Sequence, residues 1–374
     1  MKYRSFGNTN KKISSLGFGC MRLPKLNNDD MKSKLNEEKS IELLKRAYKL
    51  GINYFDTAPF YCNGQSEEMV GKAVKPFRDK IYLSTKNPIE DGSIKTFRKY
   101  LNQSLKRLDT DYIDFYHMWG INLKEYIEKI DKKNGPLYEA FKAKEEGLIK
   151  HLSFSFHDAS ENLFKLIDTG HFETMLVQYN LLDRRNEEGI KYAMEKGLGV
   201  AIMGPIAGGR LGKPSKVIQN ILPNKIYGSN ELALKFVLAN TNVTTALSGM
   251  ENIKMLEENV NIADNSGYLS DKEVENVKKA MEEKKSLANL YCTACKYCMP
   301  CPENVNIAKI FKLMNYYRIY DIKNYAKKEY KKLDGSNKKG SKAEACIECG
   351  ECESKCPQNI KIVSQLKECS KALS

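Results

Sequence analysis

Four ionisable side chains stand where chemistry on a carbonyl group could be performed. Asp56, Lys86 and His117 each end one of three successive apolar segments, and Tyr61 lies five residues beyond the first of these segments. A carbonyl oxygen becomes an alkoxide when it accepts hydride, so its site needs a proton donor and positive charge beside that oxygen. The four residues therefore indicate carbonyl reduction or its reverse, alcohol oxidation.

Each of these residues has an expected role. Tyr61 donates the proton, and a nearby Lys86 ammonium lowers the pKa of the phenol from its usual value near 10. Asp56 pairs with Lys86 and keeps it charged, while His117 hydrogen-bonds the carbonyl and orients it. Taken singly, most of them are better explained as a surface lysine, a core histidine or a loop tyrosine. Their joint occurrence at successive strand ends favours catalysis.

The elements that must position these residues alternate between apolar and helical segments. After a short hairpin in residues 1–15, strands are expected at 13–21, 54–56, 81–86, 111–117, 149–156, 174–179, 199–203 and 243–248. Helical sequence between them includes 37–49, 93–108 and 123–147, the last interrupted at Gly135-Pro136. Such strands pair in parallel, and ionisable residues at their carboxyl ends mark the active site of a barrel. We therefore expect a (β/α)8 TIM barrel. An open doubly wound sheet would need an early Gly-x-Gly-x-x-Gly, which is absent.

The same four residues resemble the catalytic tetrad of the aldo-keto reductase family. They match its Asp, Tyr, Lys and His in order and in setting, including Phe-Asp-Thr-Ala around Asp56 and Ser-Thr-Lys at Lys86. The resemblance extends to about residue 265, and we assign residues 1–268 to this barrel domain. It implies carbonyl reduction with a nicotinamide cofactor.

The resemblance also implies contacts to that cofactor. Gln178 matches the glutamine that holds the nicotinamide amide, and Ser155 matches a serine at the end of the fifth strand. The family's asparagine after that serine is Phe156 here. Matches to the pyrophosphate loop are Gly208, Arg210 and Leu211, and matches to the adenosine end are Gly249, Glu258 and Asn259. Backbone amides in a glycine-rich loop suit phosphate.

Glu251 occupies the place where relatives that prefer NADPH often carry an arginine for the 2'-phosphate. A carboxylate repels that phosphate and accepts a hydrogen bond from a ribose hydroxyl. We therefore expect NAD(P)H as cofactor, with a preference for NADH, although Lys254 lies one turn further on. Glu251 also suits the first turn of a helix, where an acid interacts with the macrodipole.

Most of the 11 cysteines lie in two runs near the C-terminus. The first run holds Cys292, Cys295, Cys298 and Cys301, and the second holds Cys346, Cys349, Cys352 and Cys356. The second has the spacing of bacterial ferredoxins, which it resembles, and this implies two [4Fe-4S] clusters. Zinc is the alternative, but zinc ribbons pair two separated Cys-x-x-Cys knuckles. Cys369 has no assigned role.

In two-cluster ferredoxins, the cysteine before proline binds the other cluster. By this rule one cluster is held by Cys292, Cys295, Cys298 and Cys356, and the other by Cys346, Cys349, Cys352 and Cys301. The first run has two residues rather than three before Cys301, which leaves the partner of that cysteine open. We expect a linking helix at 269–290 and a ferredoxin-type domain at 291–374. Its helical pattern over 304–333 places Ile307, Ile310, Phe311 and Met314 on one face.

The composition limits which binding partners and which cellular compartment we expect. The formal net charge is +14, but the lysines are spread along the chain, so we expect solvated helix faces and no nucleic-acid binding. A basic stretch could still dock an acidic redox protein such as ferredoxin or flavodoxin; it comprises Lys327, Lys328, Lys331, Lys332, Lys338, Lys339 and Lys342. No run reaches the roughly 18 apolar residues of a membrane span, and the N-terminus lacks an apolar signal core. We expect a cytoplasmic protein without membrane contact.

The expected function is hydride transfer between NAD(P)H and a small carbonyl substrate, with an appended iron-sulfur module for electron transfer. Hydride carries two electrons whereas a cluster passes one, and no flavin motif is visible to couple them. The clusters could therefore transfer electrons to a partner protein, act as a redox sensor, or serve as structural metal sites that stabilise the fold. The alternative is a redox-responsive electron carrier or binding partner in which the barrel only senses nicotinamide. The intact tetrad argues against this alternative, and Phe156 argues mildly for it.

Overall fold

The computed structural model describes residues 1–27, 33–212, 215–222, 228–264, 267–286, 298–356 and 360–374. These residues form two compact units that are interleaved along the chain. The first unit comprises Met1–Ala207 and Ala233–Leu269, and the second comprises Gly208–Leu232 and Ser270–Ser374. Within the described ranges, no helix combines the length and the apolar character needed to cross a bilayer.

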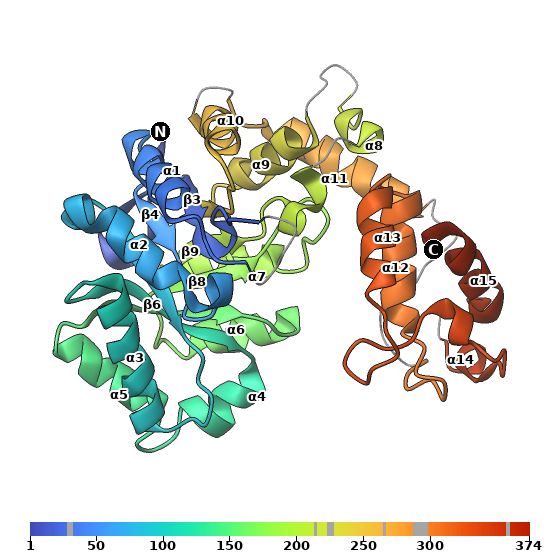
Figure 1. Ribbon diagram of the computed structural model, residues 1–374, viewed down its shortest axis with the longest axis horizontal. Helices are drawn as coiled ribbons and strands as arrows, with labels where there is room; N and C mark the ends of the chain where they lie inside the picture. The colour runs from blue at the N-terminus through green and yellow to red at the C-terminus, as the bar shows by residue number, and fades with distance from the viewer. Residues whose placement is uncertain (28–32, 213–214, 223–227, 265–266, 287–297, 357–359) are drawn as a thin grey trace. The chain divides into compact units, whose positions relative to one another are not determined.

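The first unit is built around a closed barrel of parallel strands (Figure 1). In the order in which they pair, the strands are β10 (Thr245–Ser248), β3 (Leu16–Gly19), β4 (Tyr54–Asp56), β5 (Tyr82–Asn87), β6 (Ile113–Ile121), β7 (Ile149–Phe156), β8 (Thr174–Gln178) and β9 (Gly199–Met203). The expected eight-stranded TIM barrel is confirmed. Its register places Asp56 opposite Ser84 and Lys86 opposite His117. Neighbouring parallel strands therefore deliver the ionisable residues to one end of the barrel.

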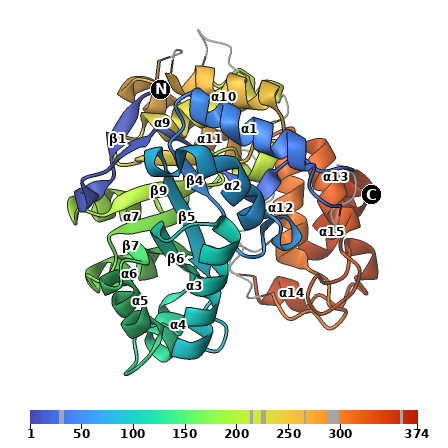
Figure 2. The same cartoon turned by 60° about the vertical axis from the view of Figure 1, so that its left-hand side comes forward.

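Helices follow the strands and surround them in both views of this unit (Figures 1 and 2). They are α1 (Glu37–Lys49), α2 (Ser66–Val74), α3 (Ile94–Leu108), α4 (Leu123–Glu125), α5 (Pro136–Glu145), α6 (Ser160–Asp168), α7 (Glu187–Glu195), α9 (Ser229–Ala239) and α10 (Ile253–Asp264). The side chains of Asn36 and Ser93 accept hydrogen bonds from backbone N–H groups in the first turns of α1 and α3. These caps explain why both helices begin where the sequence predicts.

Several boundaries differ from the sequence expectation: the strand expected at 111–117, for example, is β6 and continues to Ile121. Two larger differences have a local cause. The single strand expected at 13–21 is divided, because Ser14 accepts the N–H of Asn53 and donates to the carbonyl of Leu16 where the chain passes from hairpin to barrel. The helical sequence expected at 123–147 forms α4, a π turn η5 (Tyr126–Ile130) and α5. The interruption expected at Gly135-Pro136 is present, whereas the π turn was not predicted. Pro136 starts α5, since proline fits the first turn of a helix, where its missing N–H is not needed.

The hairpin of β1 (Tyr3–Ser5) and β2 (Lys12–Ser14) precedes the barrel and is joined by the turn η1 (Gly7–Thr9). Phe6 is fully buried and packs edge-on against Tyr54 and Phe115 in the barrel core. Gly7 adopts φ +55, and a Cβ there would lie 2.3 Å from the backbone nitrogen of Gly199, the first residue of β9. Only glycine therefore permits the turn to approach the amino end of that strand so closely.

The second unit is helical. Its helices are α8 (Lys216–Gln219), α11 (Asp271–Ser286), α12 (Ile307–Arg318), α13 (Lys323–Lys331), α14 (Glu351–Ser354) and α15 (Ile362–Leu373). α12 contacts both α13 and α15, and the three lie side by side in Figures 1 and 2. The apolar residues expected to share a face of α12 are buried: Ile307, Ile310, Phe311 and Met314. The helical stretch expected over 304–333 is two helices, α12 and α13.

Candidate functional site

The carboxyl ends of β4 and β5 carry a buried ion pair. Lys86 Nζ lies 2.7 Å from each carboxylate oxygen of Asp56 and 2.7 Å from the carbonyl oxygen of Thr57. Ser84 Oγ donates to Asp56 Oδ1 at 2.8 Å. The three protons of the ammonium therefore have three acceptors, and the lysine is held in one orientation before any ligand binds.

The charge of Lys86 is protected by its partners. Burial alone would lower the pKa of this ammonium, but Asp56 and Tyr61 outweigh that effect and raise the pKa above its usual value. Lys86 is therefore a fixed positive charge under ordinary conditions. This agrees with the role that the sequence suggests for Asp56.

Tyr61 begins the short turn η3 (Tyr61–Gly64) beyond β4, and Lys86 Nζ lies 4.7 Å from its ring centre. Cys62 and Asn63 follow in the left-handed region, with φ of +52 and +55. Burial raises the pKa of the Tyr61 phenol, and Lys86 opposes this rise without cancelling it. The net pKa is therefore raised, in contrast to the lowering expected from the sequence, because desolvation exceeds the effect of the ammonium. Tyr61 remains a protonated phenol that can act as a donor.

His117 is fully buried in the middle of β6, opposite Lys86, with Nε2 3.8 Å from Asp56 Oδ1. Neither ring nitrogen has a hydrogen-bond partner among the described residues. Burial, and then the charge of Lys86, lower the pKa of His117 well below its usual value, so the ring is neutral. Buried polar groups are nearly always partnered. These unpartnered nitrogens indicate a place for a ligand atom, such as a carbonyl oxygen that accepts an N–H.

An aromatic wall stands beside these four residues. The ring of Trp119, on β6, lies 5.9 Å from that of Tyr61 at an interplanar angle of 89° and 5.5 Å from that of Phe60. Phe60 is 55% exposed, which is unusual for phenylalanine, and its ring also meets Tyr100 edge-on. These rings suit an apolar part of a substrate. The sequence suggested Trp119 as a pocket wall, whereas Phe60 was missed; its signal is its position next to Tyr61.

A second buried charge network, formed with residues of α2 and α3, contacts β5. Glu67 of α2 is fully buried, accepts the hydroxyl of Thr85 at 2.6 Å and pairs with Arg107 at 2.6 Å. Thr85 immediately precedes Lys86, so the network restrains the strand that carries this lysine. Ser84, Thr57 and Glu67 were not identified from the sequence, because their roles depend on strand register and not on a motif.

The barrel residues expected to contact a cofactor occupy the ends of three strands. Ser155, buried on β7, accepts the backbone N–H of Gly120 at 2.6 Å and keeps its own proton available. Gln178 ends β8, and its side-chain amide has no hydrogen-bond partner within the described part of the chain. Gly249 follows β10 and lies against the side chain of Arg22. These positions fit an amide-bearing ligand near the tetrad.

The residues expected at the adenosine end differ in exposure. Glu258 is exposed on α10, whereas Asn259 is buried and donates to Ser248 Oγ at 3.2 Å. Glu251 is exposed and lies 3.8 Å from Arg22 Nη1. The carboxylate expected to repel a 2'-phosphate is thus accompanied by an arginine, which the sequence did not indicate.

The expected pyrophosphate residues lie on the turn η6 (Ala207–Gly212), which holds Gly208, Arg210 and Leu211. Gly208 and Gly209 have φ of +66 and +87, and a Cβ on Gly208 would meet no neighbour. This open, glycine-rich backbone fits a phosphate group. From Gly208 onward the turn belongs to the second unit, although the sequence assigns these residues to the barrel domain.

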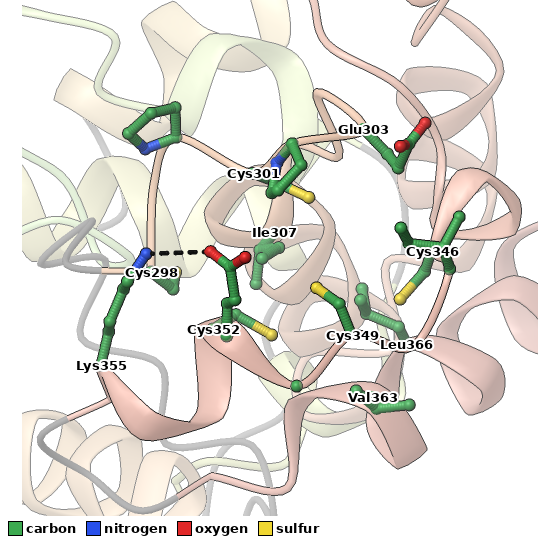
Figure 3. Close-up of a pocket in the computed structure, with 15 residues that line it drawn as sticks. Cys298, Cys301, Glu303, Ile307, Cys346, Cys349, Cys352, Lys355, Val363 and Leu366 are labelled. Carbon is green, nitrogen blue, oxygen red and sulfur yellow. Dashed lines mark hydrogen bonds and ion pairs between the residues drawn. The ribbon is translucent and has the colours of Figure 1, made fainter.

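Five cysteines surround one hollow of about 410 Å³, partly open to solvent, in the second unit (Figure 3). They are Cys298, Cys301, Cys346, Cys349 and Cys352, and we call this the cysteine-lined hollow. The set includes all four residues expected to hold one cluster. Of the other expected set, Cys298 also lines the hollow, Cys356 does not, and Cys292 and Cys295 lie outside the described residues. Apolar side chains complete the wall, among them Ile307, Val363 and Leu366.

The arrangement of these thiols bears on the choice between zinc and an iron-sulfur cluster. Zinc requires ligands about 2.3 Å from a single ion. Within the described ranges, no three Cys, His, Asp or Glu side chains converge in that way. Thiols spread around a hollow suit a cluster, in which each thiolate binds a different iron. Burial and the neighbouring Cys346 raise the pKa of the Cys352 thiol to about 11, so bound metal would be needed to form its thiolate.

Comparison with known proteins finds a family for each of two parts of the chain. Residues 15–282 match the aldo/keto reductase family, and residues 291–360 match the 4Fe-4S dicluster domain. An uncharacterized oxidoreductase of Bacillus subtilis, YqkF, is 30% identical over 73% of this chain and 94% of its own length. L-galactose dehydrogenase of Arabidopsis thaliana is 28% identical over 70% of this chain and 87% of its own length. The holo form of an aldo-keto reductase from Bacillus halodurans superposes with a TM-score of 0.64, at 30% identity over 75% of this chain and 96% of the other.

Proposed function

The chain belongs to the aldo/keto reductase family and is an NAD(P)H-dependent oxidoreductase, and from this premise we propose that it transfers hydride between the cofactor and the carbonyl group of a small aldehyde or ketone. One observation carries the proposal: a fully paired Lys86 lies beside a protonated Tyr61 and a neutral His117 whose ring nitrogens have no partner among the described residues. Those are the groups that a developing alkoxide requires.

The residues act in a simple sequence. His117 donates an N–H to the carbonyl oxygen and orients it, while the aromatic wall receives the rest of the substrate. Tyr61 Oη then transfers its proton to the alkoxide as it forms, and the Lys86 ammonium stabilises the phenolate left behind. Asp56 keeps the ammonium charged and in place. The nicotinamide cofactor, when bound, supplies or accepts the hydride.

Tyr61→Phe tests this function. Its turnover of aldehydes and ketones should fall by about 10²–10⁴-fold, the contribution of a general acid, while NADH and NADPH still bind. The matched control is Tyr54→Phe, since Tyr54 is a buried tyrosine of β4 whose hydroxyl has no partner among the described residues. If Tyr61→Phe turns over carbonyls as fast as the wild-type protein, the proposed function is wrong. An unchanged cellular role in that variant would favour a nicotinamide-sensing carrier.

We further propose NADH as the preferred cofactor. The Glu251 carboxylate supports this, but Arg22 lies close enough to attract a 2'-phosphate once that carboxylate is removed. Glu251→Gln should therefore shift the ratio of dissociation constants several-fold toward NADPH, measured by titration calorimetry. Glu258→Gln, an exposed acid on the α10 helix that follows Glu251, tests whether loss of any nearby carboxylate has the same effect. An unchanged ratio would show that Glu251 does not discriminate between NADH and NADPH and interacts only with the macrodipole of the helix that follows it.

For the second unit we propose two [4Fe-4S] clusters. Cys301, Cys346, Cys349 and Cys352 hold one, and Cys292, Cys295, Cys298 and Cys356 hold the other. The clusters, when bound, carry single electrons. Adding NADH anaerobically while following the absorbance near 400 nm tests whether they receive electrons from the barrel; bleaching would show that they do. If the absorbance is unchanged while carbonyl turnover is intact, the clusters do not receive electrons from the barrel. They would then be structural, a redox sensor, or a separate site of electron transfer.

The basic stretch beside the clusters supports an acidic redox protein as partner. Some of its lysines are engaged within the chain: Lys332 pairs with Glu329, and Lys339 pairs with Asp334. Lys328, Lys331 and Lys338 make no such pair in the described part of the chain. Binding of a ferredoxin or flavodoxin should weaken steeply with salt if these lysines dock it. We place the protein in the cytoplasm, where thiols stay reduced for metal binding.

A further inference from the structure

Near the carboxyl end of the barrel, β6 contains one residue more than its neighbour β7. Met118 pairs with Phe154. The next paired residue of β6 is Ile121, opposite Phe156, so three steps along β6 match two steps along β7. Such a mismatch is a β-bulge, which interrupts the ladder of backbone hydrogen bonds. Gly120 lies within the bulge at φ +65, in the left-handed region that glycine adopts without strain.

The hydroxyl of Ser155 closes this gap in the ladder. Its Oγ accepts the backbone N–H of Gly120 from the neighbouring strand at 2.6 Å. Ser155 is only 1% exposed, so the bond is largely shielded from water. Because the N–H belongs to the peptide group between Trp119 and Gly120, the bond fixes the direction in which the backbone leaves Trp119.

Trp119 is the part of the aromatic wall that this bond reaches. It lies two residues beyond His117 on β6, and alternate residues of a strand share a face, so its side chain lies on the same face as the buried imidazole. Its ring meets Tyr61 edge-on at 5.9 Å and Phe60 at 5.5 Å. Trp119 is partly exposed and Phe60 is exposed. Two rings with free surface beside the proton donor suit a flat aromatic substituent.

We propose that Ser155 is a positioning residue for Trp119: it holds the bulge at Gly120, and the wall so placed selects aldehydes and ketones that carry an aromatic ring. This rests on the proposed function, in which His117 orients the carbonyl and Tyr61 protonates it. It gives Ser155 a second task, since the proton of the same hydroxyl is free for the cofactor. One aromatic contact contributes roughly two- to tenfold in affinity, which a short aliphatic aldehyde does not gain.

Ser155→Ala tests the inference in the full chain, purified without oxygen. The readout is kcat/KM for benzaldehyde divided by kcat/KM for propanal, both at a saturating concentration of the same cofactor. Because both aldehydes use that cofactor, a loss of cofactor binding in the variant cancels in the ratio. We expect the ratio to fall about fivefold. Ser153→Ala should leave it unchanged; Ser153 is also buried on β7, and its hydroxyl donates to the carbonyl of Thr174.

A double-mutant cycle shows whether Ser155 acts through Trp119. Trp119→Leu should lower the same ratio by about tenfold. Adding Ser155→Ala to Trp119→Leu should then lower it no further, because the group that Ser155 positions is gone. Additive losses would overturn the positioning role. An unchanged ratio in either single variant would overturn the inference as well.

Fluorescence tests the same link without turnover. Trp119 is the only tryptophan of the chain, so its emission reports on the wall. Ser155→Ala should change the emission maximum of the ligand-free protein, whereas Ser153→Ala should not. Gly120→Ala should also change it: the nearest atom to the new Cβ, in His157, is 3.6 Å away, but an L-residue is strained at φ +65.

Two failures can be told apart. Unchanged emission in both Ser155→Ala and Gly120→Ala would show that the bond does not position Trp119, while the proposed function stands. A wild-type protein that turns over neither aldehyde would overturn the proposed function and the substrate selection together, and the emission spectra would still decide the role of Ser155.

Discussion

In the barrel, Lys86 already has its three acceptors and Glu67 its two donors in the absence of any ligand. In the second unit, five thiols surround a hollow, and no three metal-binding side chains of the described ranges meet at one point. The first site is arranged by strand register and buried charge. The second is formed by cysteines from loops and the short helix α14, and the proposed cluster would join them. The comparison is thus between a site held by buried charge and a site that we propose a cluster holds.

The largest effect should come from disrupting the barrel site, in which Lys86 and Asp56 form a buried ion pair. Lys86→Met removes the charge beside Tyr61 and leaves the buried Asp56 carboxylate without its positively charged partner, with only the Ser84 hydroxyl still donating to it. We expect kcat/KM to fall by about 10³-fold and the free energy of unfolding to fall by about 3–5 kcal/mol. Steady-state kinetics and thermal unfolding measure the two losses.

The double variant Asp56→Asn with Lys86→Met separates these losses. It removes the unpaired charge, so stability should return in part while activity stays low. If Lys86→Met keeps activity within tenfold of the wild-type value, the lysine is structural and the comparison fails.

A smaller effect is expected from removing one thiol of the hollow. Cys349→Ala should lower the absorbance near 400 nm by about half, because one of two clusters loses a ligand. Barrel turnover at saturating cofactor should remain. Cys369→Ala is the matched control, since Cys369 is buried on α15 and does not line the hollow. Equal absorbance in both variants would exclude Cys349 as a ligand.

Metal removal sharpens the comparison further. An iron chelator under reducing conditions should lower the helical circular dichroism of the second unit, because bound metal supplies much of the stability of such domains. The fluorescence of Trp119, the only tryptophan, reports on the barrel site and should change little. Loss of both signals together would show that the two sites fold as one.

The smallest effect is expected from pH. Tyr61 and Lys86 have raised pKa values, so both stay protonated at any pH below their usual values near 10, and their protons are lost only as pH rises through the raised values. His117 has a lowered pKa, so it stays neutral down to pH values below about 6.5. The reduction rate should therefore vary less than about twofold between pH 6 and 9. A fall centred near pH 6.5 would contradict the assigned protonation of His117.

Much of the barrel could be predicted from sequence because its signals are local. Asp56, Lys86 and His117 end apolar segments at regular spacing, and parallel strands bring such ends together. The partners of these residues could not be predicted in the same way. Ser84 and Thr57 become functional only through register, and Glu67 only through the packing of α2. Burial, which no spacing encodes, reversed the expected direction of the Tyr61 pKa.

In the second unit, too, patterns in the sequence could be predicted from, but contacts between residues far apart in the chain could not. The cysteine runs and the buried face of α12 were visible as patterns in the chain. The grouping of Gly208–Leu232 with the cysteine-rich residues was not, because it involves contacts between residues far apart in the chain, such as the Ser215 hydroxyl that donates to the Tyr320 carbonyl 105 positions away. The split of the first strand at Ser14 was likewise hidden, since its cause is a hydrogen bond with Asn53.

The N-terminal hairpin determines which end of the barrel is covered. Phe6 fills the core at the amino ends of the strands, and Gly7 lies against the start of β9. The hairpin therefore covers the amino ends of the strands, whereas Tyr61 follows the carboxyl end of β4. A substitution that loosens the hairpin should lower the stability of the barrel without changing the groups around Lys86.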